Sequence, residues 1–198
     1  MIIVGIDEVG RGCLVGNVVA GAVILDANFI QHLQSLGLPA LTDSKKISAK
    51  NREILYAQIT QKCQWAVGEA DAGEIDEINI LQATMLAMKR AAQNLATPYQ
   101  QVLVDGNRCP ELENCVAIIK GDLSEPAISA ASIIAKVTRD RQMLALDKLH
   151  PQYGFAGHKG YATKQHLQAL KDFGVIENQH RFSFAPVKNL SHHQGLIL

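Results

Sequence analysis

Five short apolar runs, separated by glycines and polar turns, predict five β-strands. Residues 2–6 and 18–25 form the first two, and the glycine-rich turn between them predicts an antiparallel pair. The other three runs cover residues 64–69, 101–104 and 116–119. Because strands alternate with helices after the first pair, the pattern predicts an α/β fold with a mixed sheet flanked by helices.

Apolar residues that recur at intervals of three and four predict the helices. One begins at Ser48, and a second covers residues 80–95 with Asn79 in the N-cap position. A third opens at residues 124–126 with a capping residue, an acid and a proline, and extends to about residue 149. From about residue 150 onward we expect a helical C-terminal extension, with one helix near residues 163–171.

The length of the chain fits one domain, and its charges are distributed unevenly along the sequence. The chain has 198 residues, which fits a single domain. Its 19 basic and 19 acidic residues cancel, but residues 1–119 carry 9 Lys/Arg against 13 Asp/Glu, whereas residues 120–198 carry 10 against 6. This split is either chance or the mark of an acidic, cation-binding site beside a basic surface for a polyanion.

The composition also bears on where the protein works. No apolar run approaches the roughly 20 residues that cross a bilayer, and the N-terminus lacks the basic start of a signal peptide. We therefore expect a cytoplasmic protein without a membrane segment. Its four cysteines fit no zinc pattern and are expected to be reduced thiols. The seven histidines are scattered and are expected mostly at the surface.

Three predicted strands end in carboxylates. Asp7 and Glu8 follow the first strand, Asp105 the fourth and Asp122 the fifth. Singly, each is typical of a turn, but neighbouring strands would bring the four together, where their charges repel. Mg²⁺ or Mn²⁺ would keep them ionised, and two such ions can hydrolyse a phosphodiester. Because adjacent strand residues point to opposite faces, Asp7 and Glu8 can share this site only if the strand ends there.

The turn that follows contains Gly10, Arg11 and Gly12. With Gly16, its spacing is that of neither a dinucleotide-binding fingerprint nor a P-loop. A tight turn that needs glycine at positive φ would explain it. Alternatively, a bare backbone approaches a substrate while Arg11 binds a phosphate or a carboxylate.

Other polar segments leave similar alternatives open. Ser44 and Lys45 lie in a solvated loop, or they bind a phosphate ahead of a helix. Tyr161 packs as a minor core aromatic, or its ring lies against a sugar or base. The basic residues of the helix that contains residues 127–141, Arg139 among them, are expected to be solvated.

Taken together, these motifs resemble those of ribonuclease HII, the bacterial type 2 ribonuclease H, over about residues 3–187. Each motif alone is modestly specific, but their order and spacing are highly specific. They are GIDEVGRG (5–12), TDSKK (42–46), NILQATMLAM (79–88), LVDGN (103–107), AISAASIIAKVTRDR (127–141), YGFAGHKGYATKQH (153–166) and HRFSFAPV (180–187).

The resemblance implies a ribonuclease H-like fold, with residues 1–198 as a single catalytic domain and a C-terminal extension from about residue 150. It implies a metal-dependent endonuclease that uses Mn²⁺ or Mg²⁺. The implied substrates are the RNA strand of RNA–DNA hybrids and single ribonucleotides embedded in duplex DNA. Cleavage on the 5′ side of the ribonucleotide leaves 3′-hydroxyl and 5′-phosphate ends.

The same resemblance implies roles for individual residues. The metal-binding catalytic carboxylates are Asp7, Glu8, Asp105 and Asp122. The turn that recognises the ribose 2′-hydroxyl is formed by Gly10, Arg11 and Gly12. The ring that reads the ribonucleotide–deoxyribonucleotide junction is Tyr161, and the substrate backbone is contacted by Ser44 and Lys45.

The sequence departs from the family in its first turn. Cys13 and Asn17 stand where the family usually has prolines. A proline restricts the unfolded chain, so its loss predicts a turn that is held less rigidly, with no ligand removed.

Some expectations concern partners and rival functions. The last five residues, from Gln194 through Gly195, Leu196 and Ile197 to Leu198, weakly resemble the Gln-x-Leu peptides that dock into bacterial sliding clamps, or they are a frayed terminus. We expect a monomer, because each motif serves one site. The rival functions are a non-catalytic nucleic-acid-binding module and another nuclease on the same fold, and the glycine spacing argues against a dehydrogenase.

Overall fold

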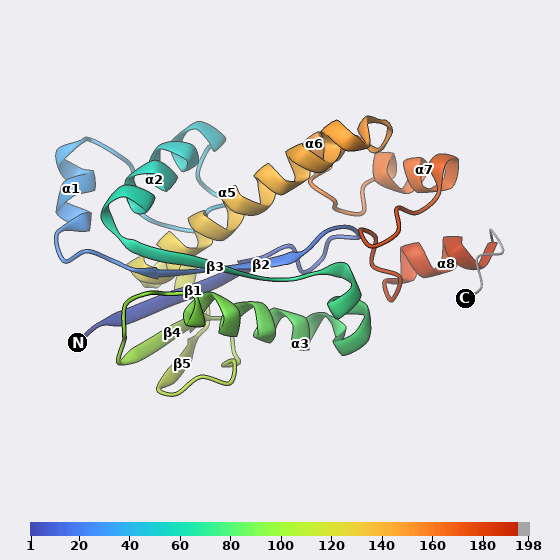
Figure 1. Ribbon diagram of the computed structural model, residues 1–198. Coiled ribbons are helices and arrows are strands. Elements are labelled where there is room, and N and C mark those ends of the chain that lie inside the picture. Colours follow the sequence, from blue (N-terminus) through green and yellow to red (C-terminus); the bar gives the residue numbers. More distant parts are fainter. Residues whose placement is uncertain (194–198) are drawn as a thin grey trace.

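The computed structural model describes residues 1–193, which surround a five-stranded mixed sheet (Figure 1). The strand order is β3-β2-β1-β4-β5; β1 is antiparallel to β2 and parallel to β4. The antiparallel pair β2–β3 and the parallel pair β4–β5 complete the sheet, which confirms the predicted mixed α/β architecture. The strands are β1 (Ile3–Val9), β2 (Val18–Ile24), β3 (Gln64–Ala70), β4 (Gln101–Asp105) and β5 (Cys115–Ile118).

Strand β1 is longer than predicted. It continues through Asp7 and Glu8 to Val9, and these two carboxylates are paired in register with Gly21 and Ala20 of β2. The prediction that the strand ends at Asp7 is therefore wrong. The ladder to β2 keeps the strand regular for three more residues, so the turn begins only at Gly10.

Helices cover both faces of the sheet and form the C-terminal extension (Figure 1). Ser48 is the N-cap of α2, as predicted, and its hydroxyl accepts from the Asn51 N–H at 3.3 Å. Helix α1, over Phe29–Ser35, was not predicted from the sequence. The helices are α1 (Phe29–Ser35), α2 (Ala49–Lys62), α3 (Ala72–Gln93), α4 (Gly121–Ser124), α5 (Pro126–Leu149), α6 (Phe155–His158), α7 (Lys164–Phe173) and α8 (Ala185–His193), with a 3₁₀ turn η1 (Pro151–Tyr153).

Helix α3 consists of two helical segments joined at a kink. The first begins with a capping box, in which Asp71 accepts from the Glu74 N–H at 2.8 Å and Glu74 accepts from the Asp71 N–H at 3.1 Å. Asn79 leaves helical geometry, at φ 65° and ψ 161°, and its side chain accepts from the N–H groups of Leu81 and Gln82. The predicted cap at Asn79 is confirmed, but the helical turns that precede it were missed.

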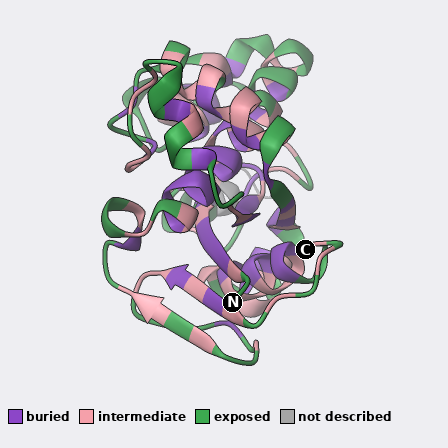
Figure 2. Ribbon diagram, turned by 90° about the vertical axis from the view of Figure 1, so that its left-hand side faces the viewer, coloured by how far each residue is buried: buried purple, intermediate pink, exposed green. Residues whose placement is uncertain are grey.

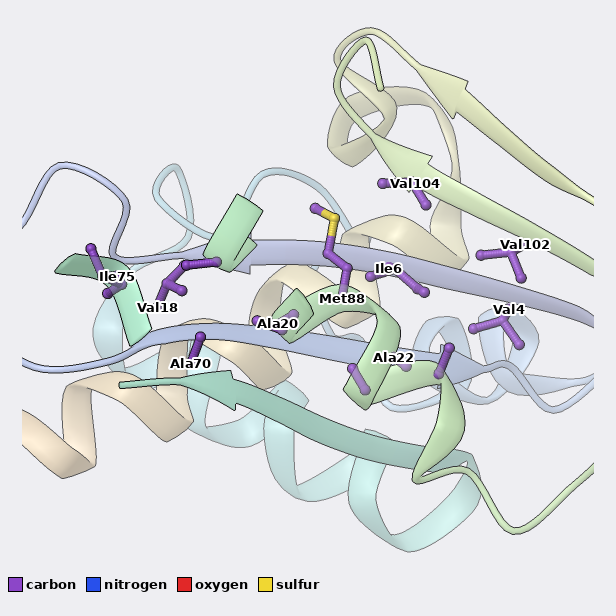
Figure 3. Close-up of a cluster of buried hydrophobic side chains, with 14 residues drawn as sticks. Val4, Ile6, Val18, Ala20, Ala22, Ala70, Ile75, Met88, Val102 and Val104 are labelled. Carbon is purple, nitrogen blue, oxygen red and sulfur yellow. The ribbon is translucent and has the colours of Figure 1, made fainter. Parts of the chain in front are cut away.

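Small residues let the helices approach the sheet closely. A Cβ atom on Gly5 of β1 would lie 2.1 Å from the main chain of Ala127 in α5, and one on Gly68 of β3 would lie 2.2 Å from the Ala87 carbonyl of α3. Side chains on the α3 side of the sheet, including Met88, Ile6 and Val104, form one core (Figure 3). The sheet is therefore sandwiched between α5 on one face and α3 on the other.

A separate core holds the C-terminal extension to the rest of the molecule. It combines Leu14 and Val15 from the loop after β1 with Met143 near the end of α5 and Phe155 and Leu170 of the extension. Figure 2 shows buried residues concentrated in the sheet and on the inward sides of the helices. Among residues 1–193, no helix has the length and apolarity needed to cross a membrane.

Candidate active site

Two candidate carboxylates lie side by side on adjacent parallel strands. Ile6 of β1 is in register with Val104 of β4, so the next residues along, Asp7 within β1 and Asp105 at the end of β4, are neighbours. Asp122 approaches from α4, just after β5, and its N–H donates to the Asp105 Oδ1 at 3.4 Å. The structure thus places Asp7 and Asp122 next to Asp105.

Asp7 is the most buried of the four, with 7% of its surface exposed. It lies on the α5 side of β1, where its Oδ1 accepts from the Glu8 N–H at 2.7 Å and Ser132 of α5 gives a hydroxyl hydrogen bond. Burial, followed by the charges of Glu8 and Asp105, raises the pKa of the Asp7 carboxyl well above its usual range. Such a group is costly to ionise without a nearby cation.

The pKa values of two other carboxylates, Glu8 and Asp122, are raised in the same way. Burial raises the pKa of Glu8, although Arg11, whose Nη1 lies 3.3 Å from the Glu8 Oε1, partly opposes the shift. Burial and the charges of Asp105 and Asp43 raise the pKa of Asp122, against the lowering effect of Lys45 and of the neighbouring lysine. The site therefore carries net negative charge.

The donor set fits a hard divalent cation in its chemistry, since all of its ligand atoms are carboxylate oxygens. In residues 1–193, however, no three His, Cys, Asp or Glu side chains are arranged to hold a metal ion. Asp7 and Glu8 are consecutive residues of a continuous strand, so their side chains leave on opposite faces. The electrostatics match a cation site, whereas the side chains are not gathered into a closed ligand set.

The turn after β1 exposes two of its three predicted substrate-binding residues. Arg11 and Gly12 are exposed, and a Cβ atom on Gly12 would meet nothing within 4 Å. Gly10 is buried at φ 96°. The glycines of this motif thus occupy different environments, one open and one packed.

The structure brings Tyr161 next to this turn. Cys13 and Tyr161 form an isolated antiparallel bridge, and the Leu14 N–H donates to the Gly160 carbonyl at 2.9 Å. The Tyr161 side chain is partly exposed, and burial of the remainder raises the pKa of its hydroxyl. The ring therefore lies beside the turn after β1 and within reach of the Lys45 charge.

Of the two predicted backbone-contacting residues, Ser44 is buried and Lys45 is exposed. Ser44 is 2% exposed; its hydroxyl is hydrogen-bonded to the Ser132 hydroxyl at 2.7 Å, and its carbonyl accepts from the Arg52 Nε at 2.8 Å. Its side chain therefore faces inward, joined to Asp7 through Ser132. Lys45 is exposed, and its charge reaches both Asp122 and Tyr161.

Cys13 and Asn17, which replace the family's prolines, are both anchored. The buried Cys13 directs its thiol toward the Lys159 carbonyl at 3.6 Å, and Asn17 donates to the Glu69 Oε2 at 2.6 Å. These contacts hold the turn from inside the fold, so the expected loosening is opposed by interactions that a sequence pattern does not reveal.

Sequence reasoning missed the buried basic and imidazole groups around the site. Arg139 was expected to be solvated, yet it is fully buried and donates three hydrogen bonds to main-chain carbonyls. Arg181 is equally buried. His166 and His180 are fully buried as well, so the expectation of surface histidines is wrong for them. The signal that could have identified Arg139 is the group of glycines that encloses it.

The fold and the acidic site together define a nuclease of the ribonuclease H type. Among solved structures, the ribonuclease H2 of Pyrococcus horikoshii superposes with a TM-score of 0.79 at 26% identity, covering 98% of each chain. The ribonuclease HII of Archaeoglobus fulgidus, solved in a PCNA complex, gives 0.69 at 27% identity over 93% of this chain and 95% of that one.

Sequence comparison identifies the family. The model of the ribonuclease HII family matches residues 4–187. A ribonuclease HII from Polynucleobacter necessarius is 58% identical over 190 residues, covering 93% of this chain and 92% of the relative. The chain therefore belongs to the ribonuclease HII family. Its members are ribonuclease H endonucleases that cleave the RNA of RNA–DNA hybrids, so the alternative of a non-catalytic binding module is wrong.

Proposed function

We propose that this ribonuclease H cleaves with two bound divalent cations, Mn²⁺ or Mg²⁺, and that it also incises duplex DNA on the 5′ side of a single embedded ribonucleotide. The products would carry 3′-hydroxyl and 5′-phosphate ends. The observation that carries the proposal is the placement of Asp7 beside Asp105 on neighbouring strands, with Glu8 next to Asp7 and the Asp122 N–H in contact with the Asp105 carboxylate.

The four carboxylates would hold the cations at the carboxyl end of β4. Asp7 and Asp105 lie side by side there, Asp122 joins Asp105 from α4, and Glu8 would reach the cations from the other face of β1, where its charge interacts with that of Asp105. When bound, divalent cations would activate a water molecule and stabilise the leaving 3′-oxygen. Ser132 would keep the Asp7 carboxylate oriented, because its hydroxyl lies between Asp7 and Ser44.

The neighbouring segments would bind the substrate. The exposed turn at Arg11 and Gly12 offers main-chain groups to a ribose 2′-hydroxyl, which distinguishes RNA from DNA without reading a base. Tyr161 would contact the sugar at the junction, and Lys45 would contact a phosphate. In this proposal residues 1–198 act as one catalytic domain, because the extension from about residue 150 supplies Tyr161.

A labelled-duplex assay tests the proposal. The substrate is duplex DNA with one ribonucleotide, incubated with Mg²⁺, with Mn²⁺ or with chelator, beside an RNA–DNA hybrid and an all-DNA duplex. We expect metal-dependent incision 5′ to the ribonucleotide and no cut in all-DNA. Cleavage of the hybrid alone would overturn the single-ribonucleotide activity.

The Asp105→Asn variant tests the carboxylate assignment separately. The substitution keeps the shape of the side chain but removes the negative charge of Asp105, which interacts with the other three carboxylates. We expect at least about a 100-fold lower rate with an unchanged circular dichroism spectrum. A rate near that of the wild type would refute the proposed site.

We also propose that the enzyme contacts a sliding clamp. The PCNA complex of the Archaeoglobus fulgidus enzyme supports a sliding-clamp partner for this family. The candidate residues, Gln194 to Leu198, lie outside the described residues. Deletion of residues 194–198 should abolish retention on an immobilised bacterial sliding clamp, and unchanged retention would refute this contact.

We further propose that the enzyme acts as a monomer in the cytoplasm. Analytical sedimentation would check the oligomeric state, and cell fractionation would check the location.

A further inference from the structure

Two fully buried arginines hydrogen-bond to the main chain of the loop after β1, residues 10–17. Arg139 comes from α5, and Arg181 comes from the segment between α7 and α8. Every hydrogen bond that their guanidinium groups make within residues 1–193 ends on a main-chain carbonyl, and neither group pairs with a carboxylate there. Buried cations without an acidic partner are costly, so a specific role is to be expected.

Arg139 joins the two proposed substrate-reading segments. Its Nη2 donates to the Val15 carbonyl at 3.0 Å and its Nε donates to the Asn17 carbonyl at 3.1 Å. Its Nη1 donates to the carbonyl of Lys159, two residues before Tyr161, at 2.8 Å. Because a guanidinium is a planar, rigid fork, one side chain fixes the separation between the loop and the Tyr161 segment.

Arg181 fixes which main-chain groups the loop presents. Its Nε and Nη2 both donate to the Gly16 carbonyl, at 3.0 and 2.7 Å, and its Nη1 donates to the Arg11 carbonyl at 3.0 Å. The N–H groups of Arg11 and Gly12 donate no hydrogen bond within residues 1–193. With the Arg11 carbonyl held inside, the exposed turn offers donors rather than acceptors.

The glycines of the two motifs make room for Arg139. A Cβ atom on Gly10 would lie 2.3 Å from the Arg139 Nε, and one on Gly160 would lie 3.3 Å from its Nη2 and 2.8 Å from the Val15 Cγ1. Gly12 has no such neighbour. The absence of a side chain at Gly10 therefore serves the seating of Arg139, whereas Gly12 is open to a ligand.

We infer that Arg139 and Arg181 are positioning residues that hold the donors of Arg11 and Gly12 at a fixed distance from Tyr161, and that they thereby set the preference for a single ribonucleotide over a continuous hybrid. The inference rests on the proposed function. A single ribonucleotide offers one 2′-hydroxyl and one junction, so both segments must engage it together. A continuous hybrid offers a 2′-hydroxyl at every nucleotide of its RNA strand, so a displaced loop can still contact one at a neighbouring position.

Steady-state kinetics of Arg139→Lys and Arg181→Lys on both substrates test the inference. Lysine keeps the charge but cannot bridge several carbonyls. We expect the ratio of kcat/KM for the single-ribonucleotide duplex to kcat/KM for the hybrid to fall by about tenfold or more. Gly10→Ala should give the same fall, because its methyl group displaces Arg139. The matched control is Arg141→Lys, an exposed residue of α5 that pairs with Glu53, which should leave the ratio unchanged.

The outcomes distinguish a failure of this inference from a failure of the proposed function. A wild-type enzyme that does not incise the single-ribonucleotide duplex refutes the proposed function. If the wild type incises it, an unchanged ratio in a folded Arg139→Lys, Arg181→Lys or Gly10→Ala variant overturns the inference. An equal loss on both substrates also overturns it, since that result indicates a structural role alone. Should one variant fail to fold by circular dichroism, the other two decide.

Discussion

At the scale of single residues, the acidic site illustrates a conflict between stability and function. The Asp7 carboxyl is buried against α5 and feels the charges of Glu8 and Asp105, which together raise its pKa. Groups of this kind destabilise the folded state when no cation balances them. In the proposed mechanism, bound divalent cations would offset this repulsion.

We predict that Asp7→Asn stabilises the metal-free protein while it abolishes cleavage of an RNA–DNA hybrid. Removal of one charge should raise the free energy of unfolding by about 1–2 kcal/mol, a few degrees in Tm. Because the folded-state pKa is raised, the gain is full above that pKa and vanishes below the ordinary pKa of aspartate. Thermal unfolding in chelator at pH 8 measures it.

The control for this prediction is Glu111→Gln, which removes a carboxylate that is 90% exposed and pairs with Lys89 of α3 rather than with a residue of the site. It should neither stabilise the protein nor change its activity. An Asp7→Asn variant with an unchanged or lower Tm in chelator would show that solvent already screens the repulsion.

The residue scale also shows what a sequence can reveal. The four carboxylates could be found because each is a polar residue at the end of an apolar run. Arg139 was missed, because its burial depends on carbonyls at Val15 and Asn17, more than a hundred residues away, and only the glycines that enclose it give a signal in the sequence. A charged residue in a helix looks solvated until the chain that surrounds it is known.

At the scale of elements, the packing of α5 on β1 depends on a missing side chain. Gly5 faces the first turn of α5, where a Cβ atom would lie 2.1 Å from the Ala127 carbonyl carbon and 2.4 Å from its oxygen. These are backbone atoms, so the contact cannot be relieved by a side-chain rotation. Helix α5 would have to move away from the sheet, and Ser132 would move with it.

We predict that Gly5→Ala destabilises the protein by about 3 kcal/mol and lowers activity by displacing Ser132 from Asp7. Gly157→Ala in α6 is the matched control, because its Cβ atom would meet nothing within 4 Å and alanine favours a helix. Urea unfolding measures both. Equal midpoints for the two variants would contradict the close approach of α5 to β1.

The kink in α3 allows a second test at this scale. Asn79 has φ 65° and ψ 161°, a region that side chains rarely adopt, and its Oδ1 caps the second helical segment. We predict that Asn79→Ala costs about 1–2 kcal/mol, since it loses the cap and keeps the strain. Asn79→Gly should cost only a few tenths, because glycine relieves the strain. If alanine were tolerated as well as glycine, the cap and strain at Asn79 would be unimportant.

The elements also show where prediction from the sequence ends. Strand positions and the caps at Ser48 and Asn79 follow from local patterns, and the structure confirms them. The end of β1 does not, because its pairing with β2, rather than the local sequence, carries the strand past Asp7 and Glu8. Helix α1 is short, and its apolar face is defined only by the core that it covers.

At the scale of the whole molecule, a chain of buried imidazoles connects the extension to the loop after β1. The His180 Nδ1 accepts from the Ile176 N–H at 2.8 Å, so its Nε2 carries the proton and donates to the His166 Nε2 at 3.2 Å. The His166 Nδ1 then donates to the Tyr161 carbonyl at 3.0 Å. His180 also bridges to Val15. Both rings must be neutral for this arrangement to hold.

Acid should therefore loosen the extension. Burial lowers the pKa of His166 to about 4 and that of His180 to about 3. In the unfolded chain both histidines take up protons near pH 6.5, so the folded state binds fewer protons and loses stability as pH falls from about 6.5 toward 4. Above pH 6.5 neither state is protonated, and this contribution to the pH dependence disappears.

We predict that the free energy of unfolding falls by roughly 2 kcal/mol per pH unit between pH 6 and 5 because of this pair, since each histidine contributes about 1 kcal/mol per unit. His180→Asn should be less stable at pH 7.5 but should show a smaller slope, because one of the two proton-binding differences is gone. His150→Gln, which removes a histidine outside this hydrogen-bonded chain, should keep the wild-type slope. Urea titrations at half-unit pH intervals give the three slopes. Parallel curves for the wild type and His180→Asn would mean that the buried imidazoles do not govern acid stability, and the acid sensitivity would then have to come from the carboxylates.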